Sequence, residues 1–249
     1  MSQTSTPPSP DATAAADGAR PVRRVLMLTH TGREEARSAA REVAAALAGH
    51  GMVVRMIARE ALDLDMSVDV ETTQDESGAS AGCELTLVIG GDGTILRAAE
   101  ITRDSGTPVL GVNLGHVGFL AEAEHDDLAS VIDAVVAQRY TVEDRMSIDV
   151  RVLRDGEVVT STFALNEASV EKAARERMLE VVVEVDGRPL SRWGCDGVVC
   201  ATPTGSTAYN FSAGGPVVWP GVEALLMVPT ARPPSENEDS ANICLPSVS

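Results

Sequence analysis

The feature that most constrains the fold is a regular alternation of short apolar runs and longer helical patterns between residues 22 and 140. Runs with the length and branched side chains of buried strands occur at 22–30, 53–58, 85–91 and 107–113. Apolar residues recur at helical spacing at 34–51, 94–104 and 126–140. Strands that alternate with helices in this way pair in parallel through right-handed crossovers. The sequence therefore predicts an α/β domain with a largely parallel sheet over residues 21–142.

The hydrophobic period changes to two after Tyr140. Apolar and polar residues alternate in 147–153 and 157–165, and the Asp155-Gly156 pair between them is typical of a tight hairpin turn. Segment 181–185, followed by Asp186-Gly187, has the same pattern. We therefore predict a domain boundary near residue 143 and an antiparallel, β-rich domain over residues 143–229.

The two ends of the chain show neither period. Residues 1–20 contain no branched aliphatic or aromatic side chain, so they cannot offset the entropy lost on ordering. Residues 230–249 are rich in proline, serine and acidic side chains, and they follow an apolar run that looks like the middle of a domain. We predict that both ends are unstructured tails and that the β-rich domain is incomplete.

Composition narrows the function classes. The chain has 249 residues, of which 44% are hydrophobic, and this is enough for a sizeable core. Its formal charge is −17, so we expect no binding to nucleic acid or to an anionic membrane through bulk charge, and any anionic ligand must be held locally. No apolar run approaches the roughly 18 residues of a membrane span, and the start lacks signal-peptide features. We expect a soluble cytoplasmic protein, with Cys195 and Cys200 as buried thiols.

The most informative segment is Gly90-Gly91-Asp92-Gly93-Thr94, between a predicted strand and a predicted helix. Glycines bring backbone N–H groups close to a ligand, and a helix start adds a positive dipole end, so the segment is suited to phosphate. An aspartate in such a loop repels phosphate unless it binds a metal or takes a proton from an attacking hydroxyl. The alternative is an ordinary turn in which Asp92 only hydrogen-bonds to the backbone.

Other candidate residues lie at the ends of predicted strands. Arg97 follows Asp92 by five residues and can reach a bound phosphate, or it is a solvated surface residue. His116, in the glycine-containing loop 111–118, is a candidate base or an ordinary turn residue. Asn166-Glu167 offers an amide and a carboxylate for a ribose, and 196–212 is a hydroxyl-rich segment suited to a sugar or adenine pocket. Both also fit polar strand ends and turns.

Taken together, GGDGTILR, GVNLGHVGFLAE, ALNEASVEK and GCDGVVCATPTGSTAYNFSAGGPVVWP resemble the NAD kinase family over about residues 22–229. GGDGT is shared with diacylglycerol, sphingosine and phosphofructo-type kinases, whereas NLGHVGFL and TPTGSTAY make the match specific. The resemblance implies transfer of the γ-phosphate of ATP to the 2′-hydroxyl of the adenosine ribose of NAD, giving NADP. It also implies Mg or another divalent metal, an active site between an α/β domain and a β-rich domain, and a homo-oligomer.

The resemblance also assigns roles to residues. It implies that Asp92 is the general base and that Asn166 and Glu167 hold the adenosine of NAD. Asp196 matches an acid that contacts the nicotinamide-side half. The remaining positions that match nucleotide-binding residues of the family are Gly91, Gly93, Thr94, Arg97, Arg177, Thr207, Ala208, Tyr209, Asn210, Phe211 and Ser212.

The chain departs from the family after Pro229, where the family's β-rich domain continues through further strands. A truncated or frameshifted reading frame is the simplest account, and it would leave apolar faces such as that of Val181, Val183 and Val185 uncovered. Two alternatives to an NAD kinase therefore stay open here. One is an inactive fragment with weak or no dinucleotide binding, and the other is a lipid kinase that uses the same GGDGT loop.

Overall fold

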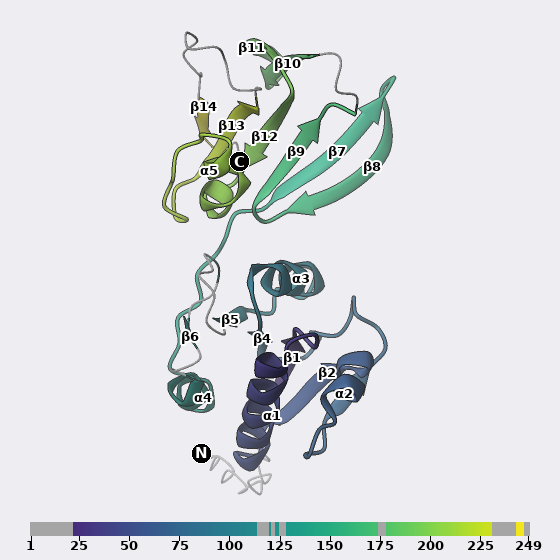
Figure 1. The fold of residues 1–249 in the computed structure, drawn as a ribbon, viewed down its shortest axis with the longest axis vertical. Coiled ribbons are helices and arrows are strands. Elements are labelled where there is room, and N and C mark those ends of the chain that lie inside the picture. The colour runs from purple at the N-terminus through teal and green to yellow at the C-terminus, as the bar shows by residue number, and fades with distance from the viewer. Residues whose placement is uncertain are drawn as a thin grey trace, which may run out of the picture.

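The computed structural model describes residues 22–113, 120, 123–124, 128–173, 178–230 and 243–246. An α/β part and a β-rich part lie one above the other along the longest axis of the molecule (Figure 1). The predicted boundary near residue 143 falls in the segment that connects them. The predicted tail at residues 1–20 lies outside the described residues.

The α/β part is built on a six-stranded sheet whose strands all pair in parallel. The strand order is β3-β2-β1-β4-β5-β6, so the chain runs outward from β1 to β3 and then returns to the other side of β1. The predicted parallel sheet is therefore confirmed, with two more strands than the pattern indicated. The strands are β1 Arg24–Thr29, β2 Val53–Ile57, β3 Glu71–Thr73, β4 Leu85–Ile89, β5 Val109–Asn113 and β6 Ala123–Glu124.

Helices cover both faces of this sheet (Figure 1). Alternate residues of β1 point to opposite faces, so Val25 and Met27 pack with α1 and α4 while Leu26 and Leu28 pack with α3. All four side chains are fully buried, which explains why the strand is apolar from Val25 to Leu28. The helices are α1 Glu34–Gly49, α2 Ala58–Leu64, α3 Asp92–Thr102 and α4 Leu128–Val136.

Helix α2 and strand β3 were missed by the sequence prediction, which treated 59–82 as a polar connection. Helix α2 has only seven residues and no side-chain cap, so it gives neither a full apolar stripe nor a start signal. Strand β3 is the three-residue segment Glu-Thr-Thr at the edge of the sheet, where a polar sequence is tolerated.

The β-rich part consists of two hairpins and a four-stranded antiparallel sheet of order β14-β13-β12-β9. Both predicted turns are confirmed, because Asp155-Gly156 and Asp186-Gly187 have the positive φ angles that tight hairpins require. The strands are β7 Ile148–Arg154, β8 Glu157–Ala164, β9 Glu167–Glu171, β10 Leu179–Val185, β11 Arg188–Cys195, β12 Gly197–Ala201, β13 Ala224–Thr230 and β14 Ile243–Pro246. The short helices η2 Thr204–Thr207 and α5 Tyr209–Ser212 follow β12.

Two expectations about the β-rich part are corrected by the structure. The segment 230–249 is not wholly unstructured, since Thr230 ends β13 and Ile243–Pro246 form β14, which pairs antiparallel with β13. A four-residue strand is too short to show a period, but it can pair with the free backbone groups along a sheet edge. Val183 is only 7% exposed, so it is covered, while Val181 and Val185 are half-buried.

The two parts touch at the C-terminal end of α3. The guanidinium of Arg103 lies 4.8 Å from the centre of the Phe163 ring and 2.5 Å from Oδ1 of Asp149. These contacts join the end of α3 to the β7–β8 hairpin. None of the helices among the described residues has the length and apolar character needed to cross a membrane.

The two parts differ in the extent of their cores. Large clusters of buried side chains line both faces of the α/β sheet, whereas the cluster in the β-rich part consists, among described residues, of Val199, Ala201 and Leu226. We therefore expect residues 22–140 to survive limited proteolysis longer than residues 143–249, because local opening is easiest where little apolar surface is buried. Mass spectrometry of a digestion time course tests this, and a single cooperative loss of both parts would contradict it.

Candidate functional site

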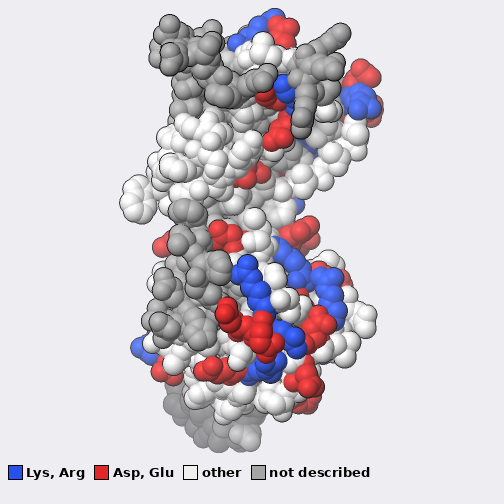
Figure 2. Space-filling model, in the orientation of Figure 1, with Lys and Arg blue, Asp and Glu red and all other residues white. Residues whose placement is uncertain are grey.

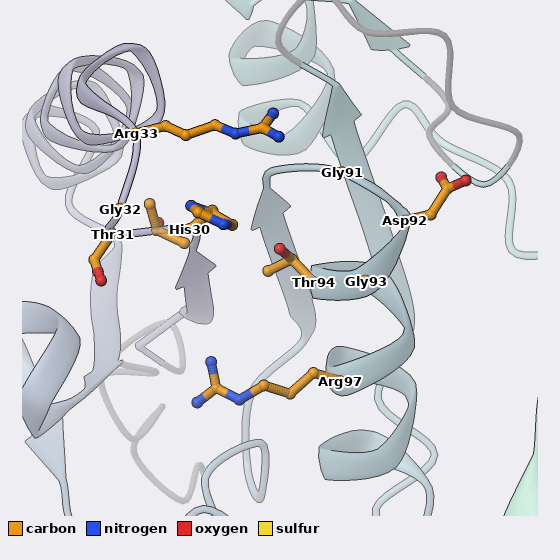
Figure 3. Close-up of a pocket in the computed structure, with 10 residues that line it drawn as sticks. His30, Thr31, Gly32, Arg33, Gly91, Asp92, Gly93, Thr94 and Arg97 are labelled. Atoms are coloured by element: carbon orange, nitrogen blue, oxygen red, sulfur yellow. The ribbon is translucent and has the colours of Figure 1, made fainter.

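The first candidate site is a cavity of about 540 Å³ at the carboxyl ends of β1 and β4. Ligands of open parallel sheets bind where the strand order reverses, and here that point lies between these two strands. Residues 29–33 after β1 form one wall, and residues 91–94 together with Arg97 form the other (Figure 3). The described lining contains only threonine, glycine, histidine, arginine and aspartate, so it is polar throughout.

Backbone hydrogen bonds to neighbouring strands fix the start of each wall of this cavity. The N–H of His30 donates to the carbonyl of Ile89 at 3.1 Å, and the N–H of Gly90 donates to the carbonyl of Val112, also at 3.1 Å. A Cβ at Gly90 would lie 2.7 Å from Oγ1 of Thr94, so packing requires glycine there. At Gly91 and Gly93, by contrast, a Cβ would meet no protein atom within 4 Å. The backbone at these two glycines is therefore open to close approach by a ligand.

Asp92 is the first residue of α3, and its carboxylate points away from His30 and Arg97 (Figure 3). Its Oδ1 accepts a hydrogen bond from the N–H of Leu120 at 3.2 Å. Leu120 lines a second cavity, on the side of α3 that faces the β-rich part. Asp92 therefore lies at the boundary between the two cavities. There its carboxylate can act on a group bound in the second cavity, next to a phosphate bound in the first.

Arg97 lines the first cavity but is held by carboxylates of the protein. Its Nη1 lies 2.5 Å from Oε1 of Glu60, and its Nη2 lies 3.2 Å from Oε2 of Glu76. Glu60 is 3% exposed, and its other oxygen accepts the N–H of Thr29 at 2.9 Å. A buried carboxylate needs such partners, so one function of Arg97 is to neutralise Glu60 beside the end of β1.

The second cavity, of about 800 Å³, lies between the two parts of the molecule. The lower wall includes Ile95 and Leu120, and the upper wall includes Phe163, Leu165 and Thr207. This lining combines apolar side chains with a few polar groups, which is the usual character of a site for an organic ligand.

Asn166 and Glu167 directly follow Leu165, which lines this cavity, although neither of the two belongs to the lining itself. Oδ1 of Asn166 and Oε2 of Glu167 are buried and have no hydrogen-bond partner among the described residues, and the same holds for Oγ1 of Thr204. Burial raises the pKa of Glu167, and a hydrogen bond from the backbone N–H of Tyr209 opposes that shift. Buried acceptors without donors are rare in folded proteins. A ligand that supplies hydroxyl or amino donors would satisfy all three.

The loop after β12 fixes the backbone at Asn166. The N–H of Thr202 donates to the carbonyl of Asn166 at 2.8 Å, and Oγ1 of Thr202 donates to the carbonyl of Leu165 at 2.6 Å. A Cβ at Gly205 would lie 2.0 Å from the carbonyl oxygen of Asn166, so only glycine allows this approach. The glycine of the TPTGSTAY segment is therefore needed for close packing against Asn166, in addition to lying near a candidate site.

The predicted binding segment 207–212 contributes unevenly. Thr207 lines the second cavity. Asn210 is fully buried, and its amide donates to the carbonyls of Ser206 and Pro216 at 3.3 and 3.0 Å, so it holds its own loop. The hydroxyl of Tyr209 donates to Glu171 at 3.2 Å, and Phe211 is 60% exposed. Ala208 joins η2 to α5, and Ser212 is the exposed last residue of α5.

The other predicted residues are outside these cavities or outside the described residues. Asp196 forms an ion pair with Lys172, with 2.5 Å between Oδ1 and Nζ, and among the described residues it is not part of either cavity lining. Arg177, His116 and most of the loop 111–118 lie outside the described residues. Cys195 is buried as predicted, whereas Cys200 is only partly buried.

Sequence reasoning missed the segment Thr29-His30-Thr31-Gly32-Arg33. Its position in the sequence could have indicated it. The segment follows the first predicted strand of the parallel sheet, just as the glycine loop follows a later predicted strand, and ligands bind at such strand ends.

For metal binding, the described part of the chain has no group of three or more histidine, cysteine, aspartate and glutamate side chains placed to hold an ion. Among the described residues that line the first cavity, Asp92 is the one that carries a carboxylate.

Comparison with known proteins matches both parts of the chain. The family model for the ATP-NAD kinase N-terminal domain matches residues 25–140, and the model for the ATP-NAD kinase C-terminal domain matches residues 165–240. NAD kinase 2 of Streptomyces avermitilis is 58% identical over 208 residues, which cover 83% of this chain and 69% of that protein.

Two solved structures are also similar. A yeast NADH kinase complexed with NADH has a TM-score of 0.81 and 26% identity, covering 92% of this chain and 70% of the yeast chain. An NAD kinase from Archaeoglobus fulgidus in complex with ATP has a TM-score of 0.65 and 26% identity, covering 90% of this chain and 77% of that one.

The buried carboxyl of Glu167 leads to a prediction about stability. Below the ordinary pKa of 4.5 the group is protonated in the folded and unfolded chains. As the pH rises from there through the raised folded-state pKa, the unfolded chain ionises first, so the folded chain loses stability. We therefore expect Glu167→Gln to be more stable than the wild type at about pH 8 but not at about pH 4.

Denaturant unfolding of the ligand-free chain at both pH values measures this difference. Glu184→Gln, at an exposed position of β10, controls for the loss of one negative charge. If Glu167→Gln were less stable than the wild type at the higher pH, the carboxylate would have a stabilising partner and the burial argument would fail.

Proposed function

The chain belongs to the NAD kinase family, and on this premise we propose that it phosphorylates NAD at the 2′-hydroxyl of its adenosine ribose, using ATP, to give NADP. The observation that supports this function best is the position of Asp92 between a polar cavity and a larger, partly apolar one. A kinase needs two adjoining sites with a proton acceptor at their junction.

We assign the phosphates of ATP to the first cavity. The backbone at Gly91 and Gly93 is open, and the start of α3 adds the positive end of the helix dipole. Thr94 and Arg97 complete this wall. The ion pairs of Arg97 with Glu60 and Glu76 leave some of its five N–H donors for a phosphate oxygen.

We assign the adenosine of NAD to the second cavity. The buried, unpaired oxygens of Asn166 and Glu167 accept hydrogen bonds from ribose hydroxyls or from the amino group of adenine. The apolar lining excludes water and gives the base a surface on which to pack. Thr207 adds a hydroxyl at the edge of this site.

In the proposed reaction the carboxylate of Asp92 takes the proton of the ribose 2′-hydroxyl. The oxygen forms a bond to the γ-phosphorus while the bond from that phosphorus to the leaving oxygen of ADP breaks. The hydrogen bond from Leu120 to Oδ1 fixes the orientation of the carboxylate. The carboxylate is thus held at the start of α3, where it can accept the proton.

A divalent metal such as Mg²⁺ fits the donor set, because this ion is usually held by substrate phosphates and one or two carboxylates rather than by a cage of protein ligands. Asp92 would be the carboxylate, and the ion would neutralise charge on the phosphates. Binding roles for Arg177, Asp196 and residues 208–212 and a homo-oligomer stay predictions from the resemblance, and a cytoplasmic location stays a prediction from the sequence composition. The lipid-kinase alternative is not favoured, because the matched family models cover both parts of the chain.

Replacing Asp92 with asparagine tests the base. Asparagine keeps an oxygen for the N–H of Leu120 but cannot take a proton, so turnover should fall by about 10²-fold or more with little change in NAD affinity. ATP-dependent formation of NADP by the purified chain measures turnover. Asp104→Asn, exposed just beyond α3, is the matched control. Undiminished turnover in Asp92→Asn would refute the role.

Replacing Glu167 with alanine tests the placement of NAD. We expect NAD binding to weaken by roughly 1–3 kcal/mol, because a ribose hydroxyl loses a charged acceptor, while ATP binding changes much less. Calorimetric titration with each nucleotide measures the two affinities, and Glu184→Ala serves as control. Equal losses for both nucleotides would show that Glu167 does not belong to the NAD site.

A further inference from the structure

Arg33 carries a positive charge that no described residue neutralises through an ion pair. Its guanidinium forms no ion pair with any residue in the described ranges, in contrast to Arg97, which contacts two glutamates. The side chain extends from the start of α1 across the first cavity toward the Gly91 side (Figure 3). In a chain of net charge −17, an unpaired cation that lines a cavity makes that cavity locally attractive to anions.

His30 is fixed between the two walls of the same cavity. A Cβ at Gly32 would lie 3.0 Å from Cε1 of the His30 ring, and a Cβ at Gly90 would lie 3.4 Å from Cβ of His30. The two glycines therefore leave room for the histidine, and its backbone N–H is held by Ile89. Whichever ring nitrogen carries the proton can donate to an anion in the cavity.

Thr29 provides an independent sign of a ligand. The residue is 3% exposed and lines the cavity, yet its Oγ1 has no hydrogen-bond partner among the described residues. A buried hydroxyl without a partner is destabilising unless a bound molecule supplies one. The cavity lining also includes the N-cap residues of α1 and α3, Arg33 and Gly91, and the positive end of a helix dipole favours an anion.

The chemistry of the lining decides which part of a nucleotide this cavity fits. Apart from the imidazole of His30, its described residues include no aromatic or large aliphatic side chain, so it offers little apolar surface for a base to pack on. The carboxylate of Asp92 points out of it (Figure 3), and the negative charge of Glu60 is matched by Arg97. What remains is a set of hydroxyl, imidazole, guanidinium and backbone donors, which suits a chain of phosphates.

We propose that Thr29, His30 and Arg33 form the second wall of a polyphosphate subsite and bind the phosphate chain of the donor nucleotide opposite the glycine loop. This inference rests on the proposed function for the identity of the donor. In the subsite, Arg33 pairs with phosphate oxygens, His30 donates one hydrogen bond, and the hydroxyl of Thr29 donates another. The glycine loop then supplies only half of the contacts to the phosphates.

Binding of ATP, inorganic tripolyphosphate and NAD to the purified full chain tests this subsite. Tripolyphosphate is the probe for phosphate recognition because it lacks base and ribose. Loss of a charged hydrogen-bond donor in Arg33→Ala should raise the dissociation constants of ATP and tripolyphosphate by about tenfold or more, and that of NAD by less than about threefold. Arg33→Lys should recover part of the loss, and His30→Ala should show a smaller effect in the same direction.

Arg192→Ala is the matched control, since it removes one exposed arginine from β11 and leaves the cavity unchanged. Circular dichroism establishes that each variant is folded. The proposal is overturned if the wild type binds neither ATP nor tripolyphosphate, if Arg33→Ala binds both as the wild type does, or if Arg33→Ala loses NAD and ATP equally. If selective loss is found but the wild type forms no NADP, the proposed function fails while the subsite stands.

Discussion

The parallel pairing of β1 with β4 is the contact on which the candidate site depends. It sets Thr29 beside Ile89, and it therefore brings two loops that lie 60 residues apart in sequence to one edge of the sheet. The hydrogen bond from His30 to Ile89 extends this pairing by one step into the loops. Because the flanking strands and both faces of the sheet are covered, the two loop ends are held by a rigid core.

Helix α3 carries that rigidity from one cavity to the other. Its start holds Asp92, its next turns place Thr94 and Arg97 in the first cavity and Ile95 in the second, and Arg103 at its end contacts the β-rich part. A shift of this helix would therefore move the proposed base and both nucleotide sites together. Since the reacting atoms of a kinase must be aligned within fractions of an ångström, a single element shared by both sites is an effective way to maintain their alignment.

The two cavities differ in the hydrogen-bonding groups they offer. The first presents donors, from Arg33, His30 and open backbone, whereas near the second the buried oxygens of Asn166 and Glu167 are acceptors without partners among the described residues. Phosphates only accept, while ribose and adenine also donate, so each end of the reaction has a matching environment. Positive and negative side chains are interspersed over the α/β part on the face seen in Figure 2, so the selectivity for anions arises inside the cavity rather than over the surface.

The sequence by itself determined the α/β and β-rich classes, the hairpin turns and the glycine loop, because strand periodicity, Asp-Gly turns and helix starts are local signals. It did not determine α2, β3 or β14, because these are short and depend on pairing with neighbours. It did not show that Asn210 holds its own loop or that Arg97, which lines the first cavity, also pairs with Glu60. Only the tertiary structure identified Arg33 as a cation of the first cavity that has no ion pair within the described ranges. The reason is that charges are neutralised by residues that are distant in the chain and meet only when the sheet has formed.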